Sequence, residues 1–284
     1  MNKIWQTSKR SIDCRAKTLV MAILNVTPDS FSDGGKFYAV DEALRQAEKL
    51  IAEGADILDV GGESTRPNAE KVAADEETRR VVPVIEAIAK RFDVPVSIDT
   101  SKSEVAENAV SAGAEIINDV SDLRFDGRVG EVAAKYQTGL VLMHLRGTFE
   151  TMHKLPPVEN IFAEVIGGFR QSIETARAFG VQDSQIALDV GIGFGKTFDQ
   201  NLELIAKLDK IAAEFSEFPM LVGASRKSFV GKILGENVSP VERVNGSLGT
   251  AAIAVWNGAN IVRVHDVKAT IEMLKVIEAL KTKI

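Results

Sequence analysis

The chain of 284 residues contains one cysteine, Cys14, so no intrachain disulfide can form, which is typical of proteins in the reducing cytosol. Its three histidines, His144, His153 and His265, lack the spacing of zinc ligands. No nucleophile with a paired base stands out either. We therefore expect a cytoplasmic protein that has no protein-built zinc site and no side chain that acts as an activated nucleophile.

Long hydrophobic runs are also absent. The apolar run 19–24 ends at Asn25, is too short to span a bilayer and is not followed by a small-residue cleavage site, so we expect neither a membrane span nor a signal peptide. A net charge of -6 argues against non-specific nucleic-acid binding. No low-complexity tract or linker interrupts the chain, so residues 1–284 are expected to form one domain that buries its own core.

Eight short runs rich in apolar and β-branched residues predict strands. Nearly continuous apolar runs suit strands that are buried on both faces of a parallel sheet. The runs are 19–26, 55–62, 95–100, 115–120, 140–144, 186–190, 220–225 and 261–266. Helical patterns lie between them, among them 41–55, 76–92, 103–114 and 159–180, with Gly54 as a helix C-cap.

Strands that alternate with helices predict an α/β fold with a parallel sheet and right-handed crossovers. The count of eight and the chain length favour a closed (β/α)8 barrel, the TIM barrel, over an open doubly wound sheet. Residues 1–18 precede the first strand, and we expect them to form a short hairpin at the barrel floor.

Polar residues end nearly every predicted strand. They are Asn25, Asp59 with Glu63, Asp99, Asn118, His144, Asp189, Ser225, and Arg263 with His265. Helix capping explains one or two of these residues, with Asp99 as a candidate together with Asp119, but not all eight positions. Because barrel enzymes place their active sites at the carboxyl ends of the strands, we expect a shared site.

Three loops suggest how a ligand is held. The segment 25–35, NVTPDSFSDGG, is a long polar loop of the kind that forms lids. GGESTRP (61–67) offers Thr65 and Arg66 to an anion such as phosphate. GIGFGK (191–196) resembles a dinucleotide fingerprint, but it follows the sixth strand, so we reject NAD binding.

Cations gather after the last two strands, where barrels often bind phosphate. SRKS (225–228) carries Arg226 and Lys227, and RVHD (263–266) carries Arg263. Arg226 is equally well explained as a solvated surface residue. Arg263 lies inside an apolar strand and requires a buried anionic partner.

The expected site therefore has two halves. Asp99, Asn118 and Asp189 can pair with the edge of a flat, donor-rich heterocycle. The cationic half suits a diphosphate and consists of Thr65, Arg66, Lys227, Arg263 and His265. A heterocycle that carries a diphosphate is the expected ligand class. Mg2+ bound mainly by that diphosphate, with one protein oxygen such as that of Asn25, is the expected metal.

The chain resembles the dihydropteroate synthase family over its whole length. NVTPDSFSDGG, GGESTRP, VSIDT, IIND, LMH, GFGK, LVGASRKSF and RVHDV occur in the family's order. The resemblance implies a transferase of folate biosynthesis that joins p-aminobenzoate to (7,8-dihydropterin-6-yl)methyl diphosphate. The products are 7,8-dihydropteroate and pyrophosphate, formed by an SN1-like displacement. It also implies Mg2+ as cofactor, sulfonamides as inhibitors and a homodimer.

The resemblance further implies the role of each site residue. The pterin would contact Asp99, Asn118, Met143, Asp189, Gly223 and Lys227. Pyrophosphate would contact Asn25, Thr65, Arg66, Arg263 and His265, with Mg2+ at Asn25. The p-aminobenzoate pocket would consist of Phe31, Pro67, Phe194, Lys227 and Ser228. The catalytic residues would be Asp99, Lys227, Arg263 and His265.

Three residues depart from the family pattern: Val190 replaces the usual proline, Asn68 a common glycine and Leu145 a common methionine. None of them removes an assigned side chain. Two alternative functions are a corrinoid-linked pterin methyltransferase and a non-catalytic pterin-binding paralogue. Segment 247–256 has few charges around its circumference, which suits either a buried barrel helix or a dimer contact, and the resemblance favours the dimer.

Overall fold

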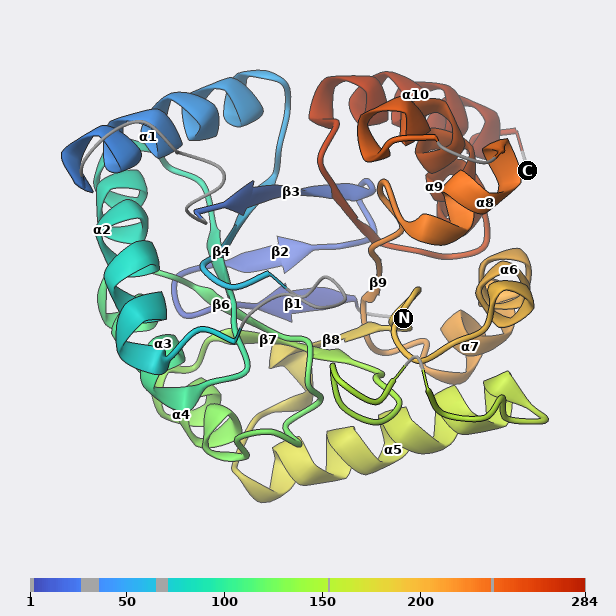
Figure 1. Cartoon of the computed structure of the whole chain (residues 1–284), viewed down its shortest axis with the longest axis horizontal. Coiled ribbons are helices and arrows are strands. Elements are labelled where there is room, and N and C mark those ends of the chain that lie inside the picture. Colours follow the sequence, from blue (N-terminus) through green and yellow to red (C-terminus); the bar gives the residue numbers. More distant parts are fainter. Residues whose placement is uncertain (1–2, 27–35, 65–70, 153, 236–237, 284) are drawn as a thin grey trace.

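The computed structural model describes residues 3–26, 36–64, 71–152, 154–235 and 238–283. Eight parallel strands form a closed barrel in the order β10-β3-β4-β5-β6-β7-β8-β9 (Figure 1). They are β3 Leu19–Asn25, β4 Ile57–Gly61, β5 Val96–Asp99, β6 Ile116–Asp119, β7 Gly139–Met143, β8 Ile186–Asp189, β9 Met220–Val222 and β10 Ile261–Val264. The predicted (β/α)8 barrel is therefore confirmed, with each strand inside or within one residue of its predicted range.

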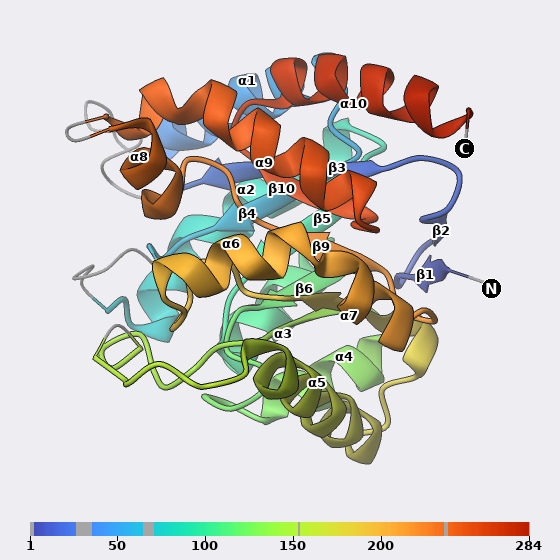
Figure 2. The same cartoon turned by 90° about the vertical axis from the view of Figure 1, so that its right-hand side faces the viewer.

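Helices surround the barrel and separate its strands (Figures 1 and 2). They are α1 Lys36–Ala52, α2 Ala74–Arg91, α3 Ser103–Ser111, α4 Arg128–Tyr136, α5 Ile161–Ala178, α6 Phe198–Ala206, α7 Leu208–Glu214, α8 Ser228–Leu234, α9 Val244–Trp256 and α10 Val267–Lys281. Gly54 follows α1 with a φ of 107°, a conformation that glycine adopts without a side-chain clash, so its prediction as a C-cap is confirmed.

An antiparallel hairpin closes the barrel floor, as predicted for residues 1–18. It pairs β1 Ile4–Gln6 with β2 Ser11–Asp13. Trp5 is fully buried and packs with the first inward-facing residues of the strands, such as Met21 and Ile116. Its indole Nε1 donates to the carbonyl of Gln185 over 2.7 Å, which ties the hairpin to the base of β8.

Alternation along the strands separates the two sides of the barrel wall. Outward residues such as Leu58 and Ile98 join the large core beneath the helices. Inward residues are apolar at the floor but polar one step higher, where Asp59, Asn118 and Asp189 replace them. The polar layer therefore lies in the upper barrel, at the carboxyl ends of the strands. None of the described helices is long and apolar enough to cross a membrane.

The floor contact gives a stability prediction. Trp5→Ala should lower the free energy of unfolding by about 3–5 kcal/mol, because it leaves a large cavity and an unpaired carbonyl. Trp256→Ala is the matched control, since that ring is 43% exposed. Urea denaturation of both variants measures the difference. Equal losses would contradict the role of Trp5 as the barrel plug.

Candidate active site

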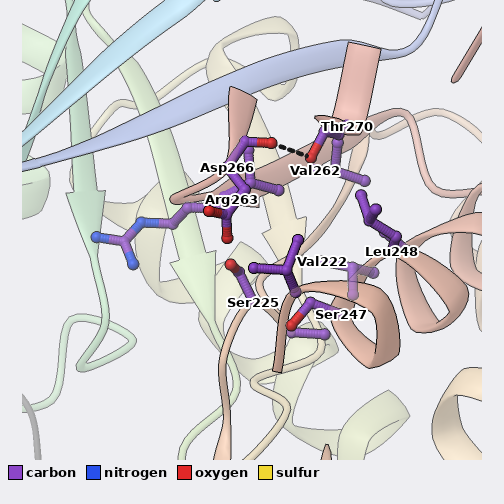
Figure 3. Close-up of a pocket in the computed structure, with 12 residues that line it drawn as sticks. Val222, Ser225, Ser247, Leu248, Val262, Arg263, Asp266 and Thr270 are labelled. Carbon is purple, nitrogen blue, oxygen red and sulfur yellow. Dashed lines mark hydrogen bonds between the residues drawn. The ribbon is translucent and has the colours of Figure 1, made fainter. Parts of the chain in front are cut away.

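Arg263 joins three strands near the barrel mouth. From β10 its Nε donates to Oδ2 of Asp59 on β4, and its NH2 donates to Oδ2 of Asp99 on β5, each over 2.6 Å. The two carboxylates are the buried anionic partners that the sequence required. In Figure 3 the guanidinium extends away from a small cavity of about 10 Å³ that Val222 and Leu248 help to line.

Asp59 also holds the amide of Asn118. It is fully buried, and its Oδ2 accepts from Nδ2 of Asn118 over 3.1 Å. The other carboxylate oxygen, Oδ1, has no hydrogen-bond partner among the described residues. The predicted heterocycle-binding half and the diphosphate-binding half are thus physically connected through one carboxylate.

Asp189 lies at the end of β8, and the backbone of the following loop holds one of its two carboxylate oxygens. Its Oδ1 accepts from the backbone N–H of Gly191 over 2.8 Å. A Cβ on Gly223 would lie 3.9 Å from Asp189 Oδ2, so the glycine keeps that oxygen uncovered. Burial raises the pKa of Asp189, while the cation Lys227 opposes the rise. Met143 pairs with Asp189 in register and belongs to an apolar cluster with Phe194.

Lys227 contacts the loop that follows β8. Its Nζ donates to the carbonyl of Ile192 and lies 4.2 Å from the ring centroid of Phe194, a cation–π contact. Burial lowers the pKa of Lys227 to about 8, and Asp189 counteracts this. Ser228 is exposed and begins α8. Lys227 and Phe194 are therefore in contact, and Ser228 follows Lys227 in the chain.

Asn25 and His265 complete the rim. A Cβ on Gly61 would lie 3.6 Å from Asn25 Oδ1 and 3.9 Å from Asp99 Oδ2, so oxygens from two strands flank this glycine. His265 Nδ1 is 3.1 Å from Ser225 Oγ. Among the described residues, no three His, Cys, Asp or Glu side chains are grouped to hold a metal.

Four predicted residues, Phe31, Thr65, Arg66 and Pro67, lie outside the described residues, as does the departure Asn68. The part of the GGESTRP segment that is described ends at Ser64. There Glu63 accepts from the N–H of Val72 over 3.0 Å and from Lys102 Nζ over 2.5 Å. Glu63 therefore anchors both described ends of this loop.

Two of the residues highlighted in the sequence do not face the site. His144 lies against α5: a Cβ on Gly168 would be 2.6 Å from its ring, and it makes an edge contact with Phe169. The prediction that all eight strand ends share one site is therefore wrong for His144. Arg226 donates from two nitrogens to Asp266, over 2.9 and 2.6 Å, so it serves a structural ion pair.

Asp119 is also structural. Its oxygens accept from the backbone N–H groups of Ser121 and Leu123 over 2.8 and 2.7 Å. The prediction of Asp119 as a helix N-cap is therefore wrong: the residue holds a turn after β6, and the next helix, α4, begins only at Arg128. The departures Val190 and Leu145 are buried apolar residues, which leaves the polar groups of the site unchanged.

Lys196 is the buried residue that sequence reasoning passed over. Its Nζ donates to the carbonyls of His144 and Phe194, each over 3.0 Å. Lys196 therefore connects the loop that contains Phe194 to the residue that follows β7. Burial lowers the pKa of Lys196 to about 7. The available sequence signal is a single lysine at the end of the glycine-rich segment GIGFGK, which carries both the dinucleotide-like pattern and the family motif GFGK.

A family model described as pterin binding enzyme matches residues 21–265, a range that contains β4 to β10 and all of β3 except its first two residues. The fold and site thus define a pterin-binding barrel enzyme. The chain is 46% identical to the dihydropteroate synthase of Synechocystis, over 94% of this chain and 92% of that protein. It is 48% identical to the Escherichia coli K12 dihydropteroate synthase, over 92% and 90% of the two chains.

Solved structures that resemble the chain point to the same family. Yersinia pestis dihydropteroate synthase, in a sulfonamide drug complex, superposes with a TM-score of 0.91 at 43% identity, over 98% of this chain and 99% of that one. The Burkholderia cenocepacia enzyme complexed with 7,8-dihydropteroate gives 0.89 at 40% identity, over 99% and 98%. The chain belongs to the dihydropteroate synthase family of transferases.

Asp99 generates a pH prediction. Burial raises its pKa to about 7, the carboxylate of Asp59 adds to the rise, and Arg263 opposes it. Only the ionised carboxyl accepts hydrogen bonds with both oxygens, so affinity for a pterin should fall about tenfold per pH unit below pH 7 and level off above it. Calorimetric titration from about pH 5.5 to 8 measures this.

Two variants control the pH experiment. Asp99→Asn should bind the pterin weakly at every pH, and its affinity should not fall below pH 7. Asp122→Asn should keep the slope, because burial also raises the pKa of Asp122 to about 7 but its carboxyl bonds to Ser172 on α5. A slope that survives in Asp99→Asn would assign the titration to another group.

Proposed function

We propose that the chain condenses (7,8-dihydropterin-6-yl)methyl diphosphate with p-aminobenzoate, giving 7,8-dihydropteroate and pyrophosphate in folate biosynthesis. The observation that carries this proposal is the row of acceptors from Asp99, Asn118 and Asp189 beside the guanidinium of Arg263. Related enzymes of the family have been solved with 4-aminobenzoic acid and with 7,8-dihydropteroate, which supports both substrates.

The pterin would lie flat across the upper barrel. Asp99, Asn118 and Asp189 would accept its N–H groups, while Met143 would contact the ring face. Gly223 leaves room for the ring because it has no side chain between Asp189 and Arg263. The pterin edge is thus recognised by charge-assisted hydrogen bonds in a buried setting, where such bonds are strong.

At the diphosphate end, the C–O bond of the pterin methylene breaks and its electron pair leaves with pyrophosphate. Arg263, His265 and Lys227 stabilise the departing charge, and Asp99 offsets the positive charge on the pterin. The amine nitrogen of p-aminobenzoate then forms the new C–N bond and releases a proton to water. An arylamine needs little help from a base, so the mechanism requires none.

Magnesium fits the oxygen-lined part of the rim. The Asn25 oxygen and the Asp99 carboxylate near Gly61 are hard ligands of the kind that Mg2+ prefers. We propose that Asn25 binds the ion, which, when present, would neutralise charge on the diphosphate. Thr65 and Arg66, outside the described residues, are proposed as further pyrophosphate contacts.

The p-aminobenzoate pocket is proposed around the lysine–aromatic pair. Phe194 offers a ring face, Lys227 a cation for the carboxylate, and Ser228 a hydroxyl at the start of α8. Phe31 and Pro67 belong to the same proposed pocket. A relative has been solved with a sulfonamide drug, and we propose that sulfonamides compete with p-aminobenzoate here.

Release of pyrophosphate from the two substrates tests the function. A pterin methyltransferase or a non-catalytic paralogue would release none. Asp189→Asn should lose about 1.5–3 kcal/mol of pterin binding, because an amide replaces a charged acceptor. Asp183→Asn is the matched control, since this carboxylate forms a surface pair with Arg177. Unchanged pterin affinity in Asp189→Asn would remove Asp189 from the site.

We also propose a cytoplasmic homodimer in which residues 1–284 form one domain. Exposed apolar side chains, including Ile233, Leu234 and Ile253, lie along α8 and α9, which occupy one side of the barrel (Figure 2). They line or border a groove of about 400 Å³ that also involves α6. An exposed apolar surface of this kind suits an interface with a second copy of the chain.

The dimer proposal predicts a change in mass. Ile253→Asp should give a monomer in sedimentation, because it places a charge in the apolar face. Val276→Asp on α10 is the control, since Val276 is 60% exposed and lies outside the groove. A monomeric unmodified protein, or dissociation by both variants, would contradict an interface at α8 and α9.

A further inference from the structure

Asp59 lies between the two halves of the proposed site but is not one of its assigned ligands. It points into the barrel from β4 and has no exposed surface. One oxygen, Oδ2, accepts from Asn118 on one side and from Arg263 on the other, over 3.1 and 2.6 Å. A single carboxylate therefore contacts one group proposed for the pterin and one proposed for the diphosphate.

The contact fixes which way the amide of Asn118 points. An ionised carboxylate can only accept hydrogen bonds, so the NH2 end of Asn118 must face Asp59. A rotated amide would place two oxygens together in a buried setting, at a cost comparable to an unsatisfied buried polar group. The carbonyl end is consequently directed away from Asp59. It joins the carboxylates of Asp99 and Asp189 as a third acceptor.

The same carboxylate orients the guanidinium. Nε of Arg263 is held by Asp59 and NH2 by Asp99, so two of its three nitrogens are engaged by protein. NH1 is the nitrogen that neither carboxylate holds. The plane of the guanidinium is thereby set before any ligand arrives, as preorganised binding of an anion requires.

We propose that Asp59 is a positioning residue that determines specificity: by fixing the amide of Asn118, it makes the site accept only a ring edge that presents N–H donors. This inference rests on the proposed function for the identity of the ring. A pterin presents such donors. Its 2-oxo counterpart, a lumazine, keeps N3–H and gains N1–H but replaces the 2-amino donor by a carbonyl, and this carbonyl would face an acceptor with no proton between the two atoms.

Calorimetry with 6-hydroxymethylpterin and 6-hydroxymethyllumazine tests this proposal. The unmodified protein should prefer the pterin by at least about tenfold. In Asp59→Asn the new amide can donate as well as accept, so Asn118 is no longer held in one orientation, and the preference should shrink about tenfold. A purely structural role would weaken both ligands equally and leave their ratio unchanged.

Ser97→Ala is the matched control. Ser97 is fully buried, pairs with Asp59 in register on β5, and its hydroxyl has no partner among the described residues. The variant removes a polar atom from the same layer without changing the direction of any bond to Asn118. It should keep the unmodified pterin-to-lumazine ratio.

A rescue experiment distinguishes an effect on the orientation of the Asn118 amide from an effect on folding. Asn118→Asp should lose pterin binding, because it places two carboxylates side by side. The exchanged pair, Asp59→Asn with Asn118→Asp, keeps the charge and restores a donor facing an acceptor. It also leaves a carboxylate oxygen for the pterin, so binding and preference should recover relative to the single Asn118 variant. Thermal unfolding of each variant confirms that it is folded.

The outcomes are distinguishable. An unmodified ligand ratio in Asp59→Asn, or an exchanged pair no better than Asn118→Asp, would overturn the inference while leaving the proposed function intact. If the single variants do not fold, the exchanged pair decides. Failure of the unmodified protein to bind the pterin would overturn the proposed function itself, and the inference with it.

Discussion

Arg263 donates to Asp59 and to Asp99, and these three side chains start from β10, β4 and β5. Charges buried at this depth are tolerated only when they are paired, and removing one partner of such a pair costs about 3–5 kcal/mol. The positions of three strand ends are therefore coupled to the geometry of one guanidinium. Asp59 in turn holds the amide of Asn118, so most of the proposed ligand-binding layer depends on this ion cluster.

The apolar floor determines the electrostatics of that layer. Trp5 and the lowest inward residues fill the barrel from below, and the polar side chains above them are largely cut off from water. Burial consequently moves the pKa of Asp99 up to about 7 and that of Lys227 down to about 8. Both groups thus have pKa values close to physiological pH, where a bound ligand of either charge can shift their protonation.

Strand existence and order could be predicted because buried parallel strands have a strong apolar signal, and the polar strand ends follow from the barrel architecture. The side of the strand on which each side chain lies could not be predicted. It alternates along the strand, so an error of one residue in the predicted strand ends reverses it. His144 therefore faces α5 instead of the mouth. Contacts between distant strands, such as Asp59 with Asn118, need the register of the folded barrel.

Barrel closure also bears on how the chain folds as it is synthesised. β3 pairs with β10, where Leu19 is opposite Ile261, so the first barrel strand keeps an open edge until nearly the whole chain has emerged. The cation of Arg263 arrives on that last strand. A nascent chain without β10 holds Asp59 and Asp99 with no guanidinium between them, and their mutual repulsion and hydration oppose premature closure of a seven-stranded barrel.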